Sequence, residues 1–145
     1  MIGLLQRVTH ASVTVDTDIV ASINTGLLVF IGVEKDDTEQ LARRLFEKII
    51  AYRVFPDNED KMNLGLQEIK GGLLLVPQFT LPADTRKGLR PSFSNAAPPE
   101  QGKSLFDFLI DYARKHYSAV ESGVFGANMQ VSLINDGPVT FWLKT

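Results

Sequence analysis

The chain has 145 residues, of which 44% are hydrophobic, and it contains no cysteine; a chain of this length supports one domain that buries roughly 68–70% of its unfolded surface. The lack of cysteine excludes disulfides, thiolate zinc sites, iron–sulfur clusters and cysteine nucleophiles, and it is compatible with a reducing compartment. The formal net charge of −2 excludes broad electrostatic attraction to nucleic acid but leaves room for a local basic patch.

Neither a membrane span nor a signal peptide is expected. The longest apolar run, LLVFIGV at residues 27–33, is far shorter than the roughly 20 residues that a membrane helix needs. The first residues, MIGLLQRV, lack the basic start and the cleavage site of a signal peptide. We therefore expect a cytoplasmic protein without a membrane partner.

Four segments are predicted to form strands. In ASVTVD, at residues 11–16, valines alternate with polar residues, which is typical of a half-buried strand, and IVASI at residues 19–23 can pair beside it. LLVFIGV at residues 27–33 and LLLVPQF at residues 73–79 are continuous apolar runs bounded by glycine. Such runs indicate strands that are covered on both faces.

Two helices are predicted to cover these strands. The first spans residues 36–52, where Asp37 and Gln40 have the spacing of a capping box and apolar residues recur at helical intervals. The second spans residues 98–117, and Pro99 suits its first turn. Interleaved strands and helices predict a single α/β domain over residues 1–145, with a mixed or largely antiparallel sheet.

A long loop separates the last of these strands from the second helix. Residues 82–98 show no periodicity, and loops of this length are usually functional or disordered. The loop carries Arg86, Lys87 and Arg90. These residues are either an ordinary solvated segment or a local patch for an anionic partner.

Conventional catalytic side chains are scarce. His10 is expected in the turn between the first two strands, without a nearby acid or serine for a triad, and His116 falls on the apolar face of the second helix. The acidic group at residues 57–60 lacks the spacing of a calcium loop and is interpreted as a turn. We expect no metal and no cofactor. An enzyme of this composition would use backbone groups and the chemistry of its substrate.

Two segments could supply such backbone groups, and the first follows a buried strand. PQFTLPADTRKG leaves the sheet and enters the long loop, so the N–H groups of Phe79 and Thr80 are candidate donors that no strand consumes. The alternative is that Phe79 belongs to the core and Thr80 to the strand.

The second segment is INDGPVTFWL at residues 134–143. Asp136–Gly137 is typical of a two-residue hairpin turn, yet Pro138 cannot donate the N–H that such a turn uses. A Gly–Pro bond can be cis at a cost of about 0.5–1 kcal/mol, and two bare carbonyl oxygens at this place would suit an ammonium group. A loop proline without a function is the alternative.

Together with QRVTHASVTV, KMNL and FGANMQVSL, these segments resemble the D-aminoacyl-tRNA deacylases, which remove D-amino acids from tRNA. The resemblance covers essentially the whole chain. Two family motifs, SQFTL and NxGPVT, match residues 77–81 and 135–140, with Pro77 in place of the family's serine. The resemblance implies a barrel-like sheet with two main helices, and any role of that serine hydroxyl cannot apply here.

The resemblance also implies a homodimer with its active site at the subunit interface. In this family pattern the carbonyl oxygens of Gly137 and Pro138, joined by a cis bond, hold the α-amino group of the substrate in the partner's pocket. The backbone of Gln78, Phe79 and Thr80 binds the ester carbonyl. Two further residues match the pattern: Arg7 braces the Gly–Pro turn and Met129 lies near the pocket mouth.

This arrangement would exclude L substrates sterically, because a rigid backbone wall stands where an L side chain would point. D-amino acids and glycine would enter. Thr80 carries a hydroxyl but no activating base, so assistance by the 2′-hydroxyl of the tRNA is favoured, with the Phe79 N–H stabilising the oxyanion. Arg86, Lys87 and Arg90 would then contact tRNA phosphates at the rim.

Two other functions remain open at this point. The chain could be a non-catalytic RNA-binding module, which would bind tRNA without turnover. It could also hydrolyse small D-amino-acid esters or peptides. Comparing the hydrolysis of D-aminoacyl-tRNA with that of a small D-amino-acid ester separates the three.

Overall fold

Strands and helices alternate along residues 1–145, all of which are described by a computed structural model. In chain order the elements are β1 (Ile2–Val15), β2 (Asp18–Ile23), β3 (Gly26–Gly32), α1 (Glu39–Ala51), β4 (Phe55–Pro56), β5 (Met62–Leu64), α2 (Leu66–Ile69), β6 (Gly72–Pro77), α3 (Pro99–His116), β7 (Val120–Ser122) and β8 (Met129–Lys144). None of the helices is long and apolar enough to cross a membrane.

Strand β1 is shared by three neighbours in the main sheet. Its first half pairs with β3, its second half pairs with β2, and β8 pairs with it along both halves. The sheet has the order β2-β1-β3-β6-β7, in which β6 is parallel to both of its neighbours and the other pairs are antiparallel. The predicted α/β fold with a mixed sheet is therefore confirmed.

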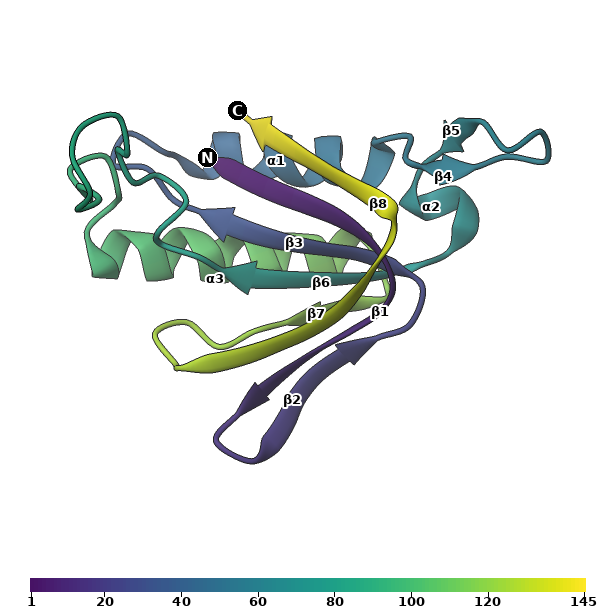
Figure 1. The fold of residues 1–145 in the computed structure, drawn as a ribbon, viewed down its shortest axis with the longest axis horizontal. Coiled ribbons are helices and arrows are strands. Elements are labelled where there is room, and N and C mark those ends of the chain that lie inside the picture. The colour runs from purple at the N-terminus through teal and green to yellow at the C-terminus, as the bar shows by residue number, and fades with distance from the viewer.

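The sheet is covered on both faces, which explains the continuous apolar runs. Helices α1 and α3 lie together behind the sheet (Figure 1), and alternate residues of β3 such as Leu27 and Val29 pack in their core with Phe46. The intervening residues, such as Leu28, belong to a second core with Leu74. This second core is covered by the second half of β1, by β2 and by the start of β8.

Both predicted helices are confirmed, but the predicted cap of the first helix is wrong. The N-cap of α1 is Thr38, whose Oγ1 accepts a hydrogen bond from the Leu41 N–H over 3.4 Å. The carboxylate of Asp37 is buried and instead accepts hydrogen bonds from the Glu34 N–H and from the amino group of Met1. Because these partners occupy Asp37, the adjacent threonine caps the helix.

One expectation about the strands also differs from the structure. His10 lies within β1 and not in a turn, because β1 begins at Ile2 and continues through the segment that the sequence left unassigned. Apolar residues on both faces of the first half of β1 hide the alternation that marks a half-buried strand. The segment around Asp136–Gly137 is not a two-residue hairpin turn, in agreement with the objection raised by Pro138, since β8 continues on both sides of it and stays paired with β1.

The second core generates a stability prediction. Leu74 is fully buried, so Leu74→Ala should lower the free energy of unfolding by about 2–5 kcal/mol through lost apolar burial and a cavity. Leu89, in the long loop, is fully exposed, so the matched change Leu89→Ala should cost less than about 0.5 kcal/mol. Urea unfolding of the two variants measures the difference, and equal losses would contradict this account of the core.

Candidate active site

A four-residue bulge interrupts the pairing of β8 with β1. Gln6 pairs with Thr140 and Val8 pairs with Asn135, so Arg7 alone faces residues 136–139. The Gly137–Pro138 peptide bond within this bulge is cis. Gly137 has φ of 141°, a value that favours glycine.

Arg7 fixes the bulge from the opposite strand. Its Nε donates to the Asp136 carbonyl oxygen over 2.9 Å, and its Nη1 donates to the Val54 carbonyl oxygen over 2.6 Å. Nε also lies 3.4 Å from the Asp136 carboxylate. Hydrogen bonds from a charged donor contribute about 1.5–3 kcal/mol each, so the half-buried guanidinium holds one end of the bulge firmly.

The tip of the bulge is exposed and has no room for an added side chain. Gly137 and Pro138 are both exposed and have no partner on β1. A Cβ at Gly137 would lie 2.7 Å from the Val139 Cγ2 and 3.2 Å from the Arg7 Nη2. The bulge therefore presents backbone groups to the outside of the chain.

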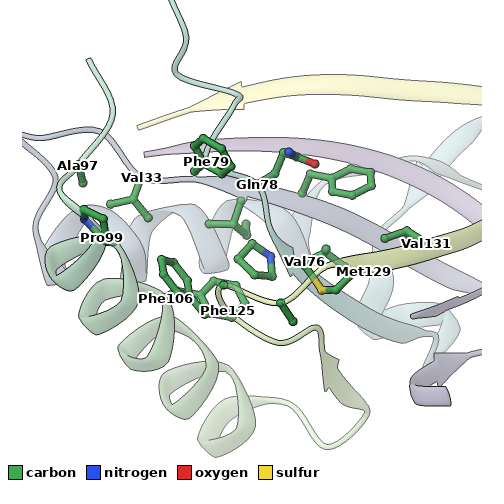
Figure 2. A pocket seen from close by; sticks show the side chains of 16 residues that line it. Val33, Val76, Gln78, Phe79, Ala97, Pro99, Phe106, Phe125, Met129 and Val131 are labelled. Atoms are coloured by element: carbon green, nitrogen blue, oxygen red, sulfur yellow. The ribbon is translucent and has the colours of Figure 1, made fainter. Parts of the chain in front are cut away.

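A second feature, an apolar pocket of about 470 Å³, lies at the carboxyl end of β6. Figure 2 shows Gln78 and Phe79 on one side of the pocket and Phe106 and Phe125 on the other. Met129, at the start of β8, also lines it. Ligand pockets in proteins commonly have this size and are mostly apolar.

Two backbone donors are free at the edge of this pocket. Gln78 donates its N–H to the Ile31 carbonyl oxygen, and Leu81 donates to Gln78. The N–H groups of Phe79 and Thr80 donate to no acceptor within the chain. Of the two readings that the sequence left open, the structure supports free donors, because β6 ends at Pro77 and Phe79 is 63% exposed.

The pocket and the bulge are far apart within one chain. Arg7 pairs with Leu27, which pairs with Leu73 at the start of β6, whereas the pocket lies at Pro77. The four residue steps from Leu73 to Pro77 correspond to about 13 Å along the strand. Figure 1 accordingly shows the bend of β8 and the carboxyl end of β6 at opposite ends of the sheet.

Comparisons with known proteins show the family of the chain. A model of the family described as D-Tyr-tRNA(Tyr) deacylase matches residues 4–144. The chain belongs to this family. Family membership makes it an ester hydrolase that acts on D-aminoacyl-tRNA, which confirms the predicted family and reaction and disfavours a non-catalytic RNA-binding module.

Similar proteins cover the whole length of the chain. A D-aminoacyl-tRNA deacylase of Cronobacter sakazakii is 58% identical over 144 residues, and one of Escherichia coli O1:K1 / APEC is 54% identical, each match covering 99% of both chains. Among solved structures, the c-Myc DNA Unwinding Element Binding Protein has a TM-score of 0.95 at 36% identity, with 100% and 99% of the two chains covered. A probable eukaryotic D-amino acid tRNA deacylase shares the fold, with a TM-score of 0.87, 19% identity and coverage of 99% and 98%.

The residues singled out in the sequence of this deacylase fall into three places. Gln78, Phe79 and Met129 line the pocket, and Thr80 is adjacent to them. Arg7, Gly137 and Pro138 lie together at the bulge. The remaining three are exposed in the long loop: Arg86, Lys87 and Arg90.

The Thr80 hydroxyl has no activating partner in the chain. Its Oγ1 accepts a hydrogen bond from the Gln78 Nε2 over 2.6 Å, and neither histidine nor lysine contacts it. His116 contacts the Tyr112 carbonyl oxygen, and His10 contacts Thr9. The structure also contains no group of three or more His, Cys, Asp or Glu residues placed to hold a metal ion.

Pro77 fits the end of β6 without loss of a ladder hydrogen bond. Along β6, Gly72 and Gln78 donate towards β3, whereas Leu73 donates to the Ala119 carbonyl oxygen on the other side. By this alternation the nitrogen of Pro77 faces the β7 side. Strand β7 has already ended at Ser122, so the missing N–H at Pro77 leaves no acceptor of the sheet unpaired.

The basic loop is partly neutralised by its own sequence. Both Nε and Nη2 of Arg86 donate to the Asp84 carboxylate, at 2.9 and 2.6 Å. These hydrogen bonds, together with the Arg86 N–H, hold the pKa of Asp84 well below its usual range, so the pair stays ionised at neutral pH. Lys87 and Arg90 form no ion pair and are the free cations of the loop.

Several pocket residues were not predicted from the sequence. Phe106 on α3 and Phe125 after β7 line the pocket, as does Ala97 at the end of the long loop. Their apolar character is the same as that of core residues, so no local pattern distinguishes the two roles. The closely spaced Gly123 and Gly126 after β7 are the one signal that marks this segment as an unusual loop.

The crowding at Gly137 predicts a loss of activity. Gly137→Ala should displace the bulge, because the new methyl group would meet Val139 and Arg7, and should lower kcat/KM for D-aminoacyl-tRNA at least about tenfold. Gly88→Ala is the control for the strain of an alanine at positive φ and is compared in its melting temperature, since Gly88 also has positive φ but has nothing within 4 Å of a built Cβ. Deacylation rates and melting temperatures of both variants are measured. A Gly137→Ala enzyme that melts early but retains its kcat/KM would contradict a role of the bulge in the reaction.

Proposed function

We propose that two copies of this chain form a homodimer in which each active site combines the pocket of one copy with the Gly137–Pro138 bulge of the other. The observation that supports this is the separation of the two features within one chain. Free backbone donors at Phe79 and Thr80 flank the pocket, whereas the exposed bulge lies at the other end of the sheet. A second copy can supply what each pocket lacks, and a symmetric pair forms two such sites.

In this site, backbone groups recognise the aminoacyl end of the tRNA. The carbonyl oxygens of Gly137 and Pro138 accept hydrogen bonds from the α-ammonium group, as the family pattern implies. The N–H groups of Phe79 and Thr80, with Gln78 beside them, bind the ester carbonyl. Arg7 keeps the bulge in position, and Met129 contributes to the pocket wall.

Chirality follows from fixing three of the four groups on the α-carbon. With the ammonium group and the ester carbonyl bound and the direction of the α-hydrogen fixed, the backbone of the bulge occupies the place of an L side chain. A D side chain points outward and glycine has none, so both are accepted and L-aminoacyl-tRNA is rejected. The enzyme would thus proofread the chirality of aminoacyl-tRNA.

The reaction proceeds with the help of the substrate itself. Water attacks the ester carbonyl carbon while the 2′-hydroxyl of the terminal ribose orients it, and the Phe79 N–H stabilises the oxyanion that forms. The bond from the carbonyl carbon to the ribose oxygen then breaks, and that oxygen takes up the proton that the attacking water loses. No metal ion or cofactor takes part in this scheme.

The long loop would bind the acceptor end of the tRNA. Lys87 and Arg90 are exposed and free of ion pairs, so they are the side chains suited to phosphate contacts, with Arg86 already bound to Asp84. Phe79 packs against Phe93 with ring centroids 5.3 Å apart and ring planes tilted by 44°, and this contact connects the loop to the pocket. A substrate made by aminoacylation places the enzyme in the cytoplasm.

The proposed mechanism gives Thr80 no role as a nucleophile. Thr80→Ala should therefore retain kcat within about tenfold, because only the hydrogen bond from Gln78 is lost and the backbone N–H stays. Single-turnover deacylation of D-aminoacyl-tRNA measures the effect. A loss of about 10⁴-fold or more in a folded variant would instead identify the hydroxyl as the nucleophile.

Mixed dimers test the shared site directly. Gly137→Ala damages the bulge, and Ala127→Trp fills the pocket that Ala127 lines, so each variant alone should retain about a tenth of the wild-type activity or less. Two affinity tags allow isolation of the mixed dimer. One of its two sites then combines an intact pocket with an intact bulge, and about half of the wild-type activity should return.

The outcome separates shared from unshared sites. A mixed dimer as inactive as its parents would show that pocket and bulge act within one chain. An active monomer in sedimentation experiments at assay concentration would contradict the dimer as well. Wild-type dimer re-formed from the same tagged chains controls for damage during the exchange.

A further inference from the structure

The side chain of Asn135 spans the neck of the bulge. Its Oδ1 accepts a hydrogen bond from the Val139 N–H over 2.6 Å, and its Nδ2 donates to the Val139 carbonyl oxygen over 3.2 Å. Nδ2 also contacts the Thr140 Oγ1 at 2.9 Å and the Gln6 Oε1 at 3.3 Å. One amide thus joins the two sides of the bulge to each other and to β1.

This amide takes the place of a missing pair of backbone hydrogen bonds. Residues 136–139 have no register partners on β1, so Val139 lies outside the regular pairing that its neighbours in the strand make. Val139 is buried, and a buried N–H without a partner costs about 1–3 kcal/mol. Asn135 satisfies both the donor and the acceptor of Val139.

The bulge is consequently held at both of its ends by different side chains. Arg7 binds the Asp136 carbonyl oxygen at the first end, and Asn135 binds Val139 at the last. Only Gly137 and Pro138 lie between these two anchors. Their position relative to the rest of the chain is therefore set by the two side chains together.

We propose that Asn135 is a positioning residue that determines how strictly the enzyme rejects L-aminoacyl-tRNA. The inference rests on the proposed function, in which the backbone of the bulge is the wall that an L side chain meets. Asn135 does not contact the substrate in this proposal. It acts by fixing Val139, and through Val139 the place of Pro138.

The requirement is for an amide, since both hydrogen-bonding roles are used at once. Aspartate at this position would still accept from the Val139 N–H but could not donate to the Val139 carbonyl oxygen, and it would bring two oxygens together. Alanine would remove both hydrogen bonds between the Asn135 side chain and Val139. A displaced wall loses more selectivity than activity, because the ester-binding donors at Phe79 and Thr80 are untouched.

The test compares D- and L-aminoacyl-tRNA carrying the same amino acid. We expect Asn135→Ala to lower the ratio of kcat/KM for D over L by about tenfold or more, given that a 1 Å misplacement in an active site can cost about 10²-fold. Asn135→Asp should lower the ratio by less. The matched control is Asn63→Ala, which removes an amide that donates to the Asp57 carboxylate over 2.6 Å in the β4–β5 hairpin.

Melting temperature and dimer content are measured alongside the rates. Asn63→Ala should lower the melting temperature without changing the D-to-L ratio. If the role of Asn135 were merely structural, Asn135→Ala would give this same result. An unchanged ratio in Asn135→Ala overturns the proposal. If Asn135→Ala fails to fold, the ratio in Asn135→Asp decides, and failure of both to fold overturns it too, because Asn135 would then serve the whole fold.

Gly137→Ala separates this inference from the proposed function. If Gly137→Ala changes the D-to-L ratio and Asn135→Ala does not, the bulge is the wall but Asn135 does not set it. If neither variant changes the ratio, the bulge is not the wall, and the proposed function fails together with the inference. The expected result is a lowered ratio in both.

Discussion

The unequal pairing of β1 and β8 is the constraint on which the rest of the site depends. Between the pair Gln6–Thr140 and the pair Val8–Asn135, β1 has one residue and β8 has four. The excess chain has to leave the sheet, and β8 pairs with β1 on both sides of it, with a further register shift between Val8 and His10. A flexible surface loop is avoided because Arg7 and Asn135 tie the departing and returning ends.

A site built from backbone groups has a particular specificity. Carbonyl oxygens and N–H groups are present at every residue, so recognition reads the shape of the main chain and not the identity of side chains. Such a site can exclude one hand of an amino acid while it ignores which amino acid is present. Because the site uses backbone groups, a proline is tolerated at residue 77, where the family pattern has serine. Neither the side chain nor the nitrogen of Pro77 is needed by the sheet.

Local patterns predicted the long elements and failed where pairing partners decide. Helices α1 and α3 and strands β2, β3 and β6 were predicted because their periodicity and flanking glycines or prolines are local signals. The first half of β1 was missed because Gln6 and Arg7 interrupt its apolar residues, and β8 was not assigned because the Asp136–Gly137 turn signal, which Pro138 contradicts, belongs to a bulge whose flanking residues pair with β1 and not with each other. Phe79, Thr80 and the Gly137–Pro138 turn were singled out by their backbone chemistry, and Arg7, Gln78 and Met129 by resemblance. Phe106 and Phe125 look like ordinary core in the sequence, and the role of Asn135 depends on contacts four and five residues away.

The ion pair of Asp84 with Arg86 bears on how the product leaves. Under the proposed function, the loop offers only Lys87 and Arg90 to phosphates, because Arg86 is already neutralised. Two phosphate contacts on a single-stranded end give a salt slope of about −1.4, so a fourfold rise in salt would weaken binding only about sevenfold. Such a weak electrostatic hold favours rapid release of the deacylated tRNA, and it leaves the selectivity of the encounter to the aminoacyl end rather than to the nucleic acid.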